Sequence, residues 1–89
     1  MKHFATVTLS KFDFPWNSNM TFKINLDDAI KLNNSKSWKI VKDYLGEKVS
    51  DDIKSIQIES PLKNNLTYIL ILRPDKSPFS GIIGAHPFM

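Results

Sequence analysis

The residues with the widest range of chemistry in this chain are two histidines, His3 and His86, which lie near opposite ends of the sequence. A histidine beside a carboxylate can carry out acid–base catalysis. Neither histidine stands in a recognisable catalytic context with a serine or an aspartate, and a working active site must position several groups at once. We therefore expect ordinary surface or strand-edge histidines in a protein that is not an enzyme.

Two pairs of acids, Asp27–Asp28 and Asp51–Asp52, could hold a hard cation through their oxygens. The glycine-punctuated loop of calcium-binding proteins is missing, so we expect helix caps and solvated turns instead. The chain has no cysteine, which excludes disulfides and thiolate zinc sites. The segment Gly81-Ile82-Ile83-Gly84 lacks the lysine and hydroxyl residue of a phosphate-binding loop. The sequence thus predicts neither a metal nor a cofactor.

An aromatic run with basic neighbours is the one combination that suggests nucleic acid. Phe12, Phe14 and Trp16 alternate along the chain, with Lys11 before them and Lys23 after the next turn. Bases stack on aromatic rings while lysines attract the phosphate backbone, and this needs no reading of sequence. The alternative is that the rings fill the core. We expect at least two to do so, and Trp16 is the ring best placed for an exposed binding loop.

The basic charge is mild and comes almost entirely from lysine. The net charge is +3, and Arg73 is the only arginine among the twelve basic residues. Sites for bidentate phosphate or base contacts favour arginine, whereas lysines attract polyanions without specificity. A predicted helix carries lysines on its outer face, of which Lys39 and Lys42 are candidates for a basic stripe that binds an acidic partner. A solvated helix face is the alternative.

Alternation of apolar and polar residues predicts four strands. The fourth is nearly all apolar, which is typical of a strand that is central or covered on both faces, with Ile69 and Ile71 in the core. The predicted strands are residues 3–9, 20–26, 53–59 and 66–72.

Between the second and third strands the pattern is helical. Asp27 is the expected N-cap, with Ala29, Ile30 and Leu32 toward the core. Ser35 or Ser37 can cap a second segment that carries Trp38, Val41 and Leu45 at helical spacing, and Gly46 is expected to end it. Residues 27–46 therefore form either one kinked helix or two short ones.

These elements predict a single small α+β domain over residues 1–76, in ββαββ order, with a four-stranded sheet and one kinked or split helix on one face. One arrangement places the first and last strands side by side and parallel, as in a β-grasp topology, with a right-handed crossover through the helix. The alternative is an antiparallel meander with the helix across it.

Residues 77–89 are predicted to form an apolar tail that is rich in proline and glycine. Disordered tails are usually polar, so this one is expected to dock on its own domain, on a second copy or on another protein. Its exposed aromatic candidates are Phe79 and Phe88. Near the other end, the apolar stretch Phe4–Leu9 is too short for a signal peptide or a membrane span, which favours an intracellular protein.

The favoured function is therefore a non-enzymatic protein-binding module in which Phe14 and Trp16 of a hairpin loop, together with Phe79 and Phe88, dock on a larger protein. Small inhibitors or modulators from phages and other mobile elements, such as anti-defence proteins, are typical of this size class. The alternative is a non-specific single-stranded nucleic-acid binder. An enzymatic reading requires two subunits to build a site that neither has alone.

Overall fold

A computed structural model of the chain describes residues 3–11, 18–62 and 65–84. These residues form five strands and two α-helices, and a short 3-10 turn, Gly46–Lys48, follows the second helix. In chain order the elements are β1 (Phe4–Ser10), β2 (Ser18–Asn25), α1 (Leu26–Ser35), α2 (Trp38–Leu45), β3 (Ser55–Pro61), β4 (Leu66–Arg73) and β5 (Lys76–Gly84).

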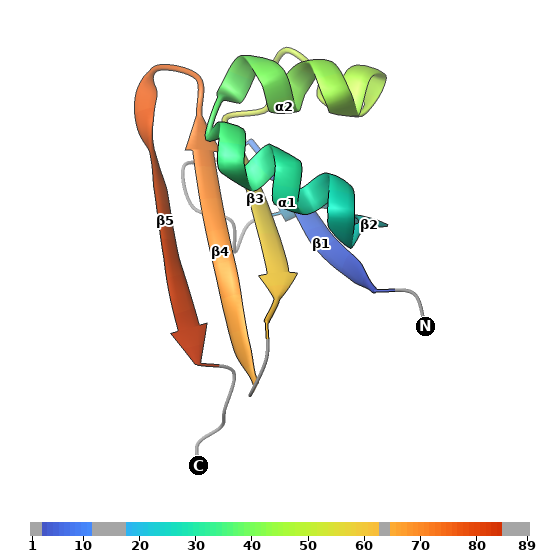
Figure 1. The fold of residues 1–89 in the computed structure, drawn as a ribbon. Helices are drawn as coiled ribbons and strands as arrows, with labels where there is room; N and C mark the ends of the chain where they lie inside the picture. Colours follow the sequence, from blue (N-terminus) through green and yellow to red (C-terminus); the bar gives the residue numbers. More distant parts are fainter. Residues whose placement is uncertain (1–2, 12–17, 63–64, 85–89) are drawn as a thin grey trace.

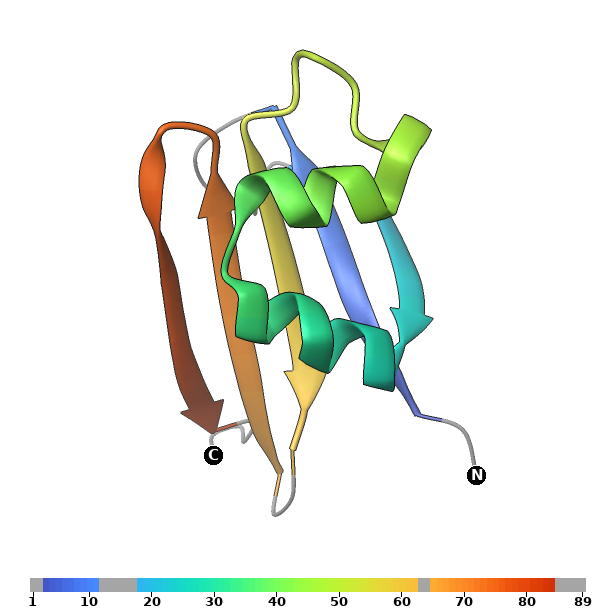
Figure 2. The same ribbon diagram turned by 45° about the horizontal axis from the view of Figure 1, so that its top comes forward.

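The five strands form one sheet in the order β2-β1-β3-β4-β5, and every neighbouring pair is antiparallel. The chain leaves β2, passes through both helices, and returns as β3 on the other side of β1. The last three strands then form a meander. Both helices lie on the same face of the sheet and cross its middle strands, while β5 lies beyond them at one edge (Figures 1 and 2).

The prediction of four strands and one helix was therefore incomplete, and the β-grasp pairing was wrong. β1 is an interior strand, but its neighbours are β2 and β3, not a parallel last strand, and the central strand is β3. The fifth strand is β5, which pairs with β4 and includes residues 77–84 of the segment predicted to be a tail. Pro78, Gly81 and Gly84 interrupt its apolar pattern, and such residues are typical of turns rather than strands. Residues 85–89 lie outside the described residues.

The two helices begin and end at identifiable caps. Asn25, not the predicted Asp27, caps α1: its side-chain oxygen accepts from the backbone N–H of Asp27 at 2.8 Å. The helix ends at Lys36, whose left-handed backbone (φ 49°, ψ 35°) turns the chain. Ser37 then caps α2 as predicted, accepting from a backbone N–H at 3.3 Å. Gly46 ends α2 with φ +62°, also as predicted. The split-helix alternative is thus confirmed.

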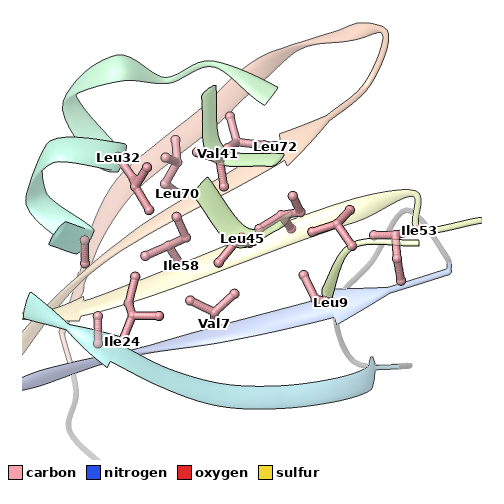
Figure 3. Close-up of a cluster of buried hydrophobic side chains, with 14 residues drawn as sticks. Val7, Leu9, Ile24, Leu32, Val41, Leu45, Ile53, Ile58, Leu70 and Leu72 are labelled. Atoms are coloured by element: carbon pink, nitrogen blue, oxygen red, sulfur yellow. The ribbon is translucent and has the colours of Figure 1, made fainter. Parts of the chain in front are cut away.

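The core lies between the helices and one face of the sheet (Figure 3). Val7, Ile58 and Leu70 come from three adjacent strands, are paired in register and are fully buried. Leu32 of α1 and Val41 of α2 pack over this layer. The buried apolar cluster comprises Ala5, Val7, Leu9, Ile24, Ala29, Leu32, Val41, Leu45, Val49, Ile53, Ile56, Ile58, Leu70 and Leu72.

Strand β4 differs from the expectation of burial on both faces. Leu70 and Leu72 point into the core, whereas Ile69 and Ile71 point to the opposite face and are half-buried. The reason is that both helices pack on one face of the sheet, so alternate residues of β4 have no helix above them. Ile30 was also expected in the core, but its side chain is exposed.

One hydrogen bond joins the two helices directly. The Tyr44 hydroxyl of α2 donates to Asp28 Oδ2 of α1 at 2.7 Å. This bond, with partial burial and the nearby negative charge, raises the pKa of Tyr44 because all three favour the protonated phenol. The bond joins the first turn of α1 to the last turn of α2, at the ends of the two helices that are remote from the turn at Lys36.

The one-sided core leads to a stability prediction within β4. Leu70→Ala should lower the free energy of unfolding by about 2–5 kcal/mol, because it removes a fully buried side chain and leaves a cavity. Ile71→Ala should cost clearly less, because Ile71 keeps part of its surface in water. Urea denaturation of both variants measures the difference. An equal or larger loss of unfolding free energy for Ile71→Ala would show that the side of β4 without helices is as buried as the core side.

The Tyr44–Asp28 bond predicts a shift in tyrosine titration. The raised folded-state pKa means that the stabilising contribution is present below the ordinary tyrosine pKa of 10.0 and is lost as pH rises through the raised value. Absorbance of tyrosinate should show Tyr44 ionising at higher pH in the wild type than in Asp28→Ala. The variant Tyr44→Phe lacks the Tyr44 signal and so distinguishes it from the signal of Tyr68. Identical titration curves for the wild type and Asp28→Ala would contradict the bond.

Candidate protein-binding site

The sequence-predicted anchors divide into described and undescribed positions. Phe14, Trp16 and Phe88 lie outside the described residues. Phe79 lies on β5 and is 60% exposed. Lys39 is exposed on α2.

The other candidate chemical groups do not converge. His3 is exposed next to β1. Asp28 binds Tyr44, while Asp52 accepts a hydrogen bond from Ser50 and forms a 3.0 Å ion pair with Lys11. The Ser50 bond, followed by the contact with Lys11, lowers the pKa of Asp52. Within residues 3–11, 18–62 and 65–84, no three histidines or acids gather where they could hold a metal ion.

The most exposed apolar surface lies on β5. We define the β5 edge strip as residues 77–84, a segment that contains no charged residue. Phe79 and Ile82 are 60% and 63% exposed, the highest values among the described large apolar side chains. Phe79 pairs with Ile71 on the face without helices, and Ile82 pairs with Tyr68 on the face that carries them. The strip thus presents one apolar anchor on each face of the sheet.

The backbone of this strip is also open on one side. Among the described strands, β5 has a hydrogen-bonded neighbour only in β4. An edge strand presents a row of N–H and C=O groups that can pair with another chain, and proteins commonly protect such edges with charge. The opposite edge, β2, carries the exposed Lys23 within its length, whereas β5 carries its one charge, the exposed Lys76, at its first residue and none over residues 77–84. Its chemistry is therefore suited to receiving an additional strand.

A small hollow lies beside α1 on the helix side of the sheet. We call it the α1 hollow; its volume is about 180 Å³. Its lining is mostly apolar, and one lining residue, Tyr68, is the cross-strand partner of Ile82, so hollow and strip adjoin. The lining residues are Ile30, Asn33, Asn34, Ser60, Leu62 and Tyr68.

The hollow contains a buried polar pair. Asn33 Nδ2 donates to Ser60 Oγ at 2.8 Å, and Asn33 is only 6% exposed. The other amide atom, Asn33 Oδ1, is buried without a hydrogen-bond partner among the described residues. An unsatisfied buried acceptor costs stability. Sequence reasoning missed this pair because the two residues are separated by 27 positions.

A charged groove of about 310 Å³ lies at the other end of the sheet, beside the β4–β5 turn. Its lining includes the half-buried Trp38 and Lys42. Of the two lysines predicted for a basic stripe, Lys42 therefore lines this groove and Lys39 does not. Its charges are mixed, with three lysines against two aspartates. The lining residues are Trp38, Lys42, Ser50, Asp51, Ile53, Lys54, Pro74, Asp75 and Lys76.

The buried polar pair predicts an unusual double-mutant result. Ser60→Ala alone should destabilise the protein by about 1–3 kcal/mol, because it leaves the whole Asn33 amide unpaired. Adding Asn33→Leu should recover most of that loss or exceed it, since the unpaired Asn33 amide is then replaced by an apolar side chain. Thermal denaturation of the two variants and the wild type gives the comparison. A double variant less stable than Ser60→Ala would mean that Asn33 has further stabilising contacts.

No helix within the described residues is long and apolar enough to cross a membrane. Comparisons with protein-family models, with curated proteins and with solved structures found no match. The β5 edge strip, the α1 hollow and the charged groove therefore carry the functional inference by themselves.

Proposed function

We propose that this protein is a non-enzymatic binding module that docks on a larger protein through β5. The observation that carries the proposal is the uncharged edge strip, in which Phe79 and Ile82 are the most exposed large apolar side chains of the described residues. An extended segment of the partner adds to this edge as a sixth strand. Its main-chain groups pair with those of β5.

Strand addition divides affinity and specificity between backbone and side chains. The main-chain hydrogen bonds supply affinity, and alternate partner side chains reach opposite faces of the extended sheet. On one face they pack beside Phe79, and on the other beside Ile82. Aromatic anchors that lose their water on binding often contribute about 2 kcal/mol or more each, so Phe79 is the expected energetic centre.

By occupying a site on its partner, such a module acts as an inhibitor or modulator. An anti-defence protein of a phage or mobile element is one setting for such an activity. Phe14, Trp16 and Phe88 remain predicted as additional anchors.

The second candidate, non-specific binding of single-stranded nucleic acid, is favoured by the charged groove. Trp38 offers a ring for base stacking, and Lys42 and Lys54 offer positive charge for phosphates. Asp51 and Asp75 line the same groove and would repel a phosphate backbone. The mixed charge makes this groove a weaker candidate than the β5 edge strip.

Affinity capture from the native host lysate tests the proposal with a matched pair of variants. Phe79→Asp places a charge in the edge strip, and Phe4→Asp places one at another exposed phenylalanine, 48% exposed on β1. The wild type and Phe4→Asp should retain the same protein partner, and Phe79→Asp should lose it. Nuclease should not change the result.

The salt dependence separates the two candidates. Raising salt from about 50 to 200 mM should change the affinity for a protein partner only modestly, because the anchors are apolar. A partner bound through six to ten phosphates would lose about 10³–10⁵ in affinity over that range. Nuclease-sensitive capture, a steep salt slope, or equal retention by Phe79→Asp and Phe4→Asp would contradict strand docking.

A further inference from the structure

We propose that β5 also pairs with β5 of a second copy of this chain, antiparallel and about a two-fold axis at Ser80, so that two sheets join into one. The self-pairing is inferred from the sequence and geometry of β5 alone. Its consequence, that self-association competes with docking of the partner segment, rests on the proposed function.

The length of β5 fixes the register of a symmetric pair. The strand comprises the 9 residues Lys76–Gly84, and Ser80 is the middle one. In an antiparallel pair of identical strands, full overlap therefore places Ser80 opposite Ser80 of the second copy. Every neighbouring pair of strands in the described sheet is already antiparallel, so this pairing continues the pattern of the sheet. Because both copies use the same surface, the contact closes as a dimer.

The distribution of charge along β5 suits self-pairing. Near a two-fold axis each side chain lies close to its own counterpart, and like charges directly opposite each other are destabilising. β5 carries no charge over residues 77–84, and its one charged residue, Lys76, is its first. In the full-overlap register the two Lys76 residues lie at opposite ends of the pair, roughly 27 Å apart along the strands. No like charges therefore meet across the contact.

The residues beside the axis are complementary in shape. Full overlap places Phe79 of each copy opposite Gly81 of the other. Both residues lie on the face without helices, where their partners in β4 are Ile71 and Ile69. Apart from its chain neighbours, no described atom lies within 4 Å of the position that a Cβ on Gly81 would take. The Phe79 ring, 60% exposed, can therefore cover Gly81 of the second copy, and an aromatic residue opposite an edge glycine stabilises a sheet.

The pair is expected to be weak and to depend on concentration. One strand edge of each copy forms the contact, and Pro78 offers a carbonyl but no N–H to the facing Ile82. Protein interfaces of less than about 1,200 Å² are typical of transient complexes. At low micromolar concentrations the edge is therefore open to the partner segment, whereas at high concentrations a second copy covers it.

Sedimentation equilibrium of the full chain tests the dimer without any partner. We expect the mean mass to rise from that of one chain at about 10 µM towards that of two chains at about 1 mM, because a small interface is populated only at high concentration. No larger species should form, because a two-fold contact uses the free edge of β5 in both copies. A chain that stays monomeric over this range, or that grows into larger assemblies, would overturn the proposal.

An exchange of charge at residue 80 tests the two-fold register. Ser80→Lys and Ser80→Asp each place like charges face to face in the dimer, so either variant alone should remain monomeric. An equal mixture of the two places opposite charges face to face and should dimerise about as well as the wild type. Thr21→Lys and Thr21→Asp are the matched controls, because Thr21 is exposed on the opposite edge strand β2. Both controls should dimerise like the wild type.

Nuclear magnetic resonance spectra of the same samples report folding and contacts. Amide dispersion shows whether each variant is folded. In a mixture of labelled and unlabelled wild-type chains, isotope-filtered spectra should show contacts between the Phe79 ring of one copy and the Gly81 Hα atoms of the other.

Dimers of either folded residue-80 variant by itself, a folded mixture that stays monomeric, or a dimer without the Phe79–Gly81 contacts would overturn the pairing. The outcomes also separate it from the proposed function. A monomeric chain whose capture of a partner is lost in Phe79→Asp would refute the second copy and leave strand docking standing. A dimer that follows the charge exchange, with capture independent of Phe79, would support the pairing and refute docking of the partner at β5.

Discussion

The limited reach of the two helices determines what this protein leaves exposed. A helix rises about 1.5 Å per residue, so the ten residues of α1 extend about 15 Å and the eight of α2 about 12 Å. Five strands about 4.8 Å apart need roughly 19 Å of cover. The helices cross the middle of the sheet and stop before β5 (Figure 2). The buried cluster ends where they end, and the fifth strand is left with exposed apolar side chains on both faces.

The regular parts of this architecture could be predicted from sequence because they follow local rules. Alternating residues indicated the first four strands, and Ser37 and Gly46 marked the ends of α2. β5 was missed because its proline and glycines hide the alternation of a strand. Strand order was also missed, since the position of β1 between β2 and β3 depends on contacts distant in sequence. Ile69 and Ile71 are as apolar as their buried neighbours, so only the placement of the helices shows which face of β4 is covered.

The candidate site could also be predicted only in part, because its geometry depends on how strands and helices distant in sequence pack together. Phe79 was recognised as a candidate anchor because an exposed phenylalanine needs a binding surface. Its location on a strand edge came only with the sheet. The Asn33–Ser60 pair has no local signature, because an asparagine within a helix usually signals only a weak helix former. The pair can be recognised only from the structure, in which Asn33 of α1 and Ser60 of β3 are both buried and joined by a hydrogen bond. Within the described part of the chain Asn33 Oδ1 has no hydrogen-bond partner, which is a stability cost in a domain of this size.

Hydrogen–deuterium exchange on the chain, alone and with its captured partner, tests the central claim most directly. Backbone amides on the outer side of an edge strand exchange readily, and an added strand protects them. The account predicts new protection concentrated in residues 77–84, with the opposite edge strand β2 unchanged. Protection that appears along β2 or around the charged groove, while residues 77–84 exchange as in the free protein, would contradict docking at β5.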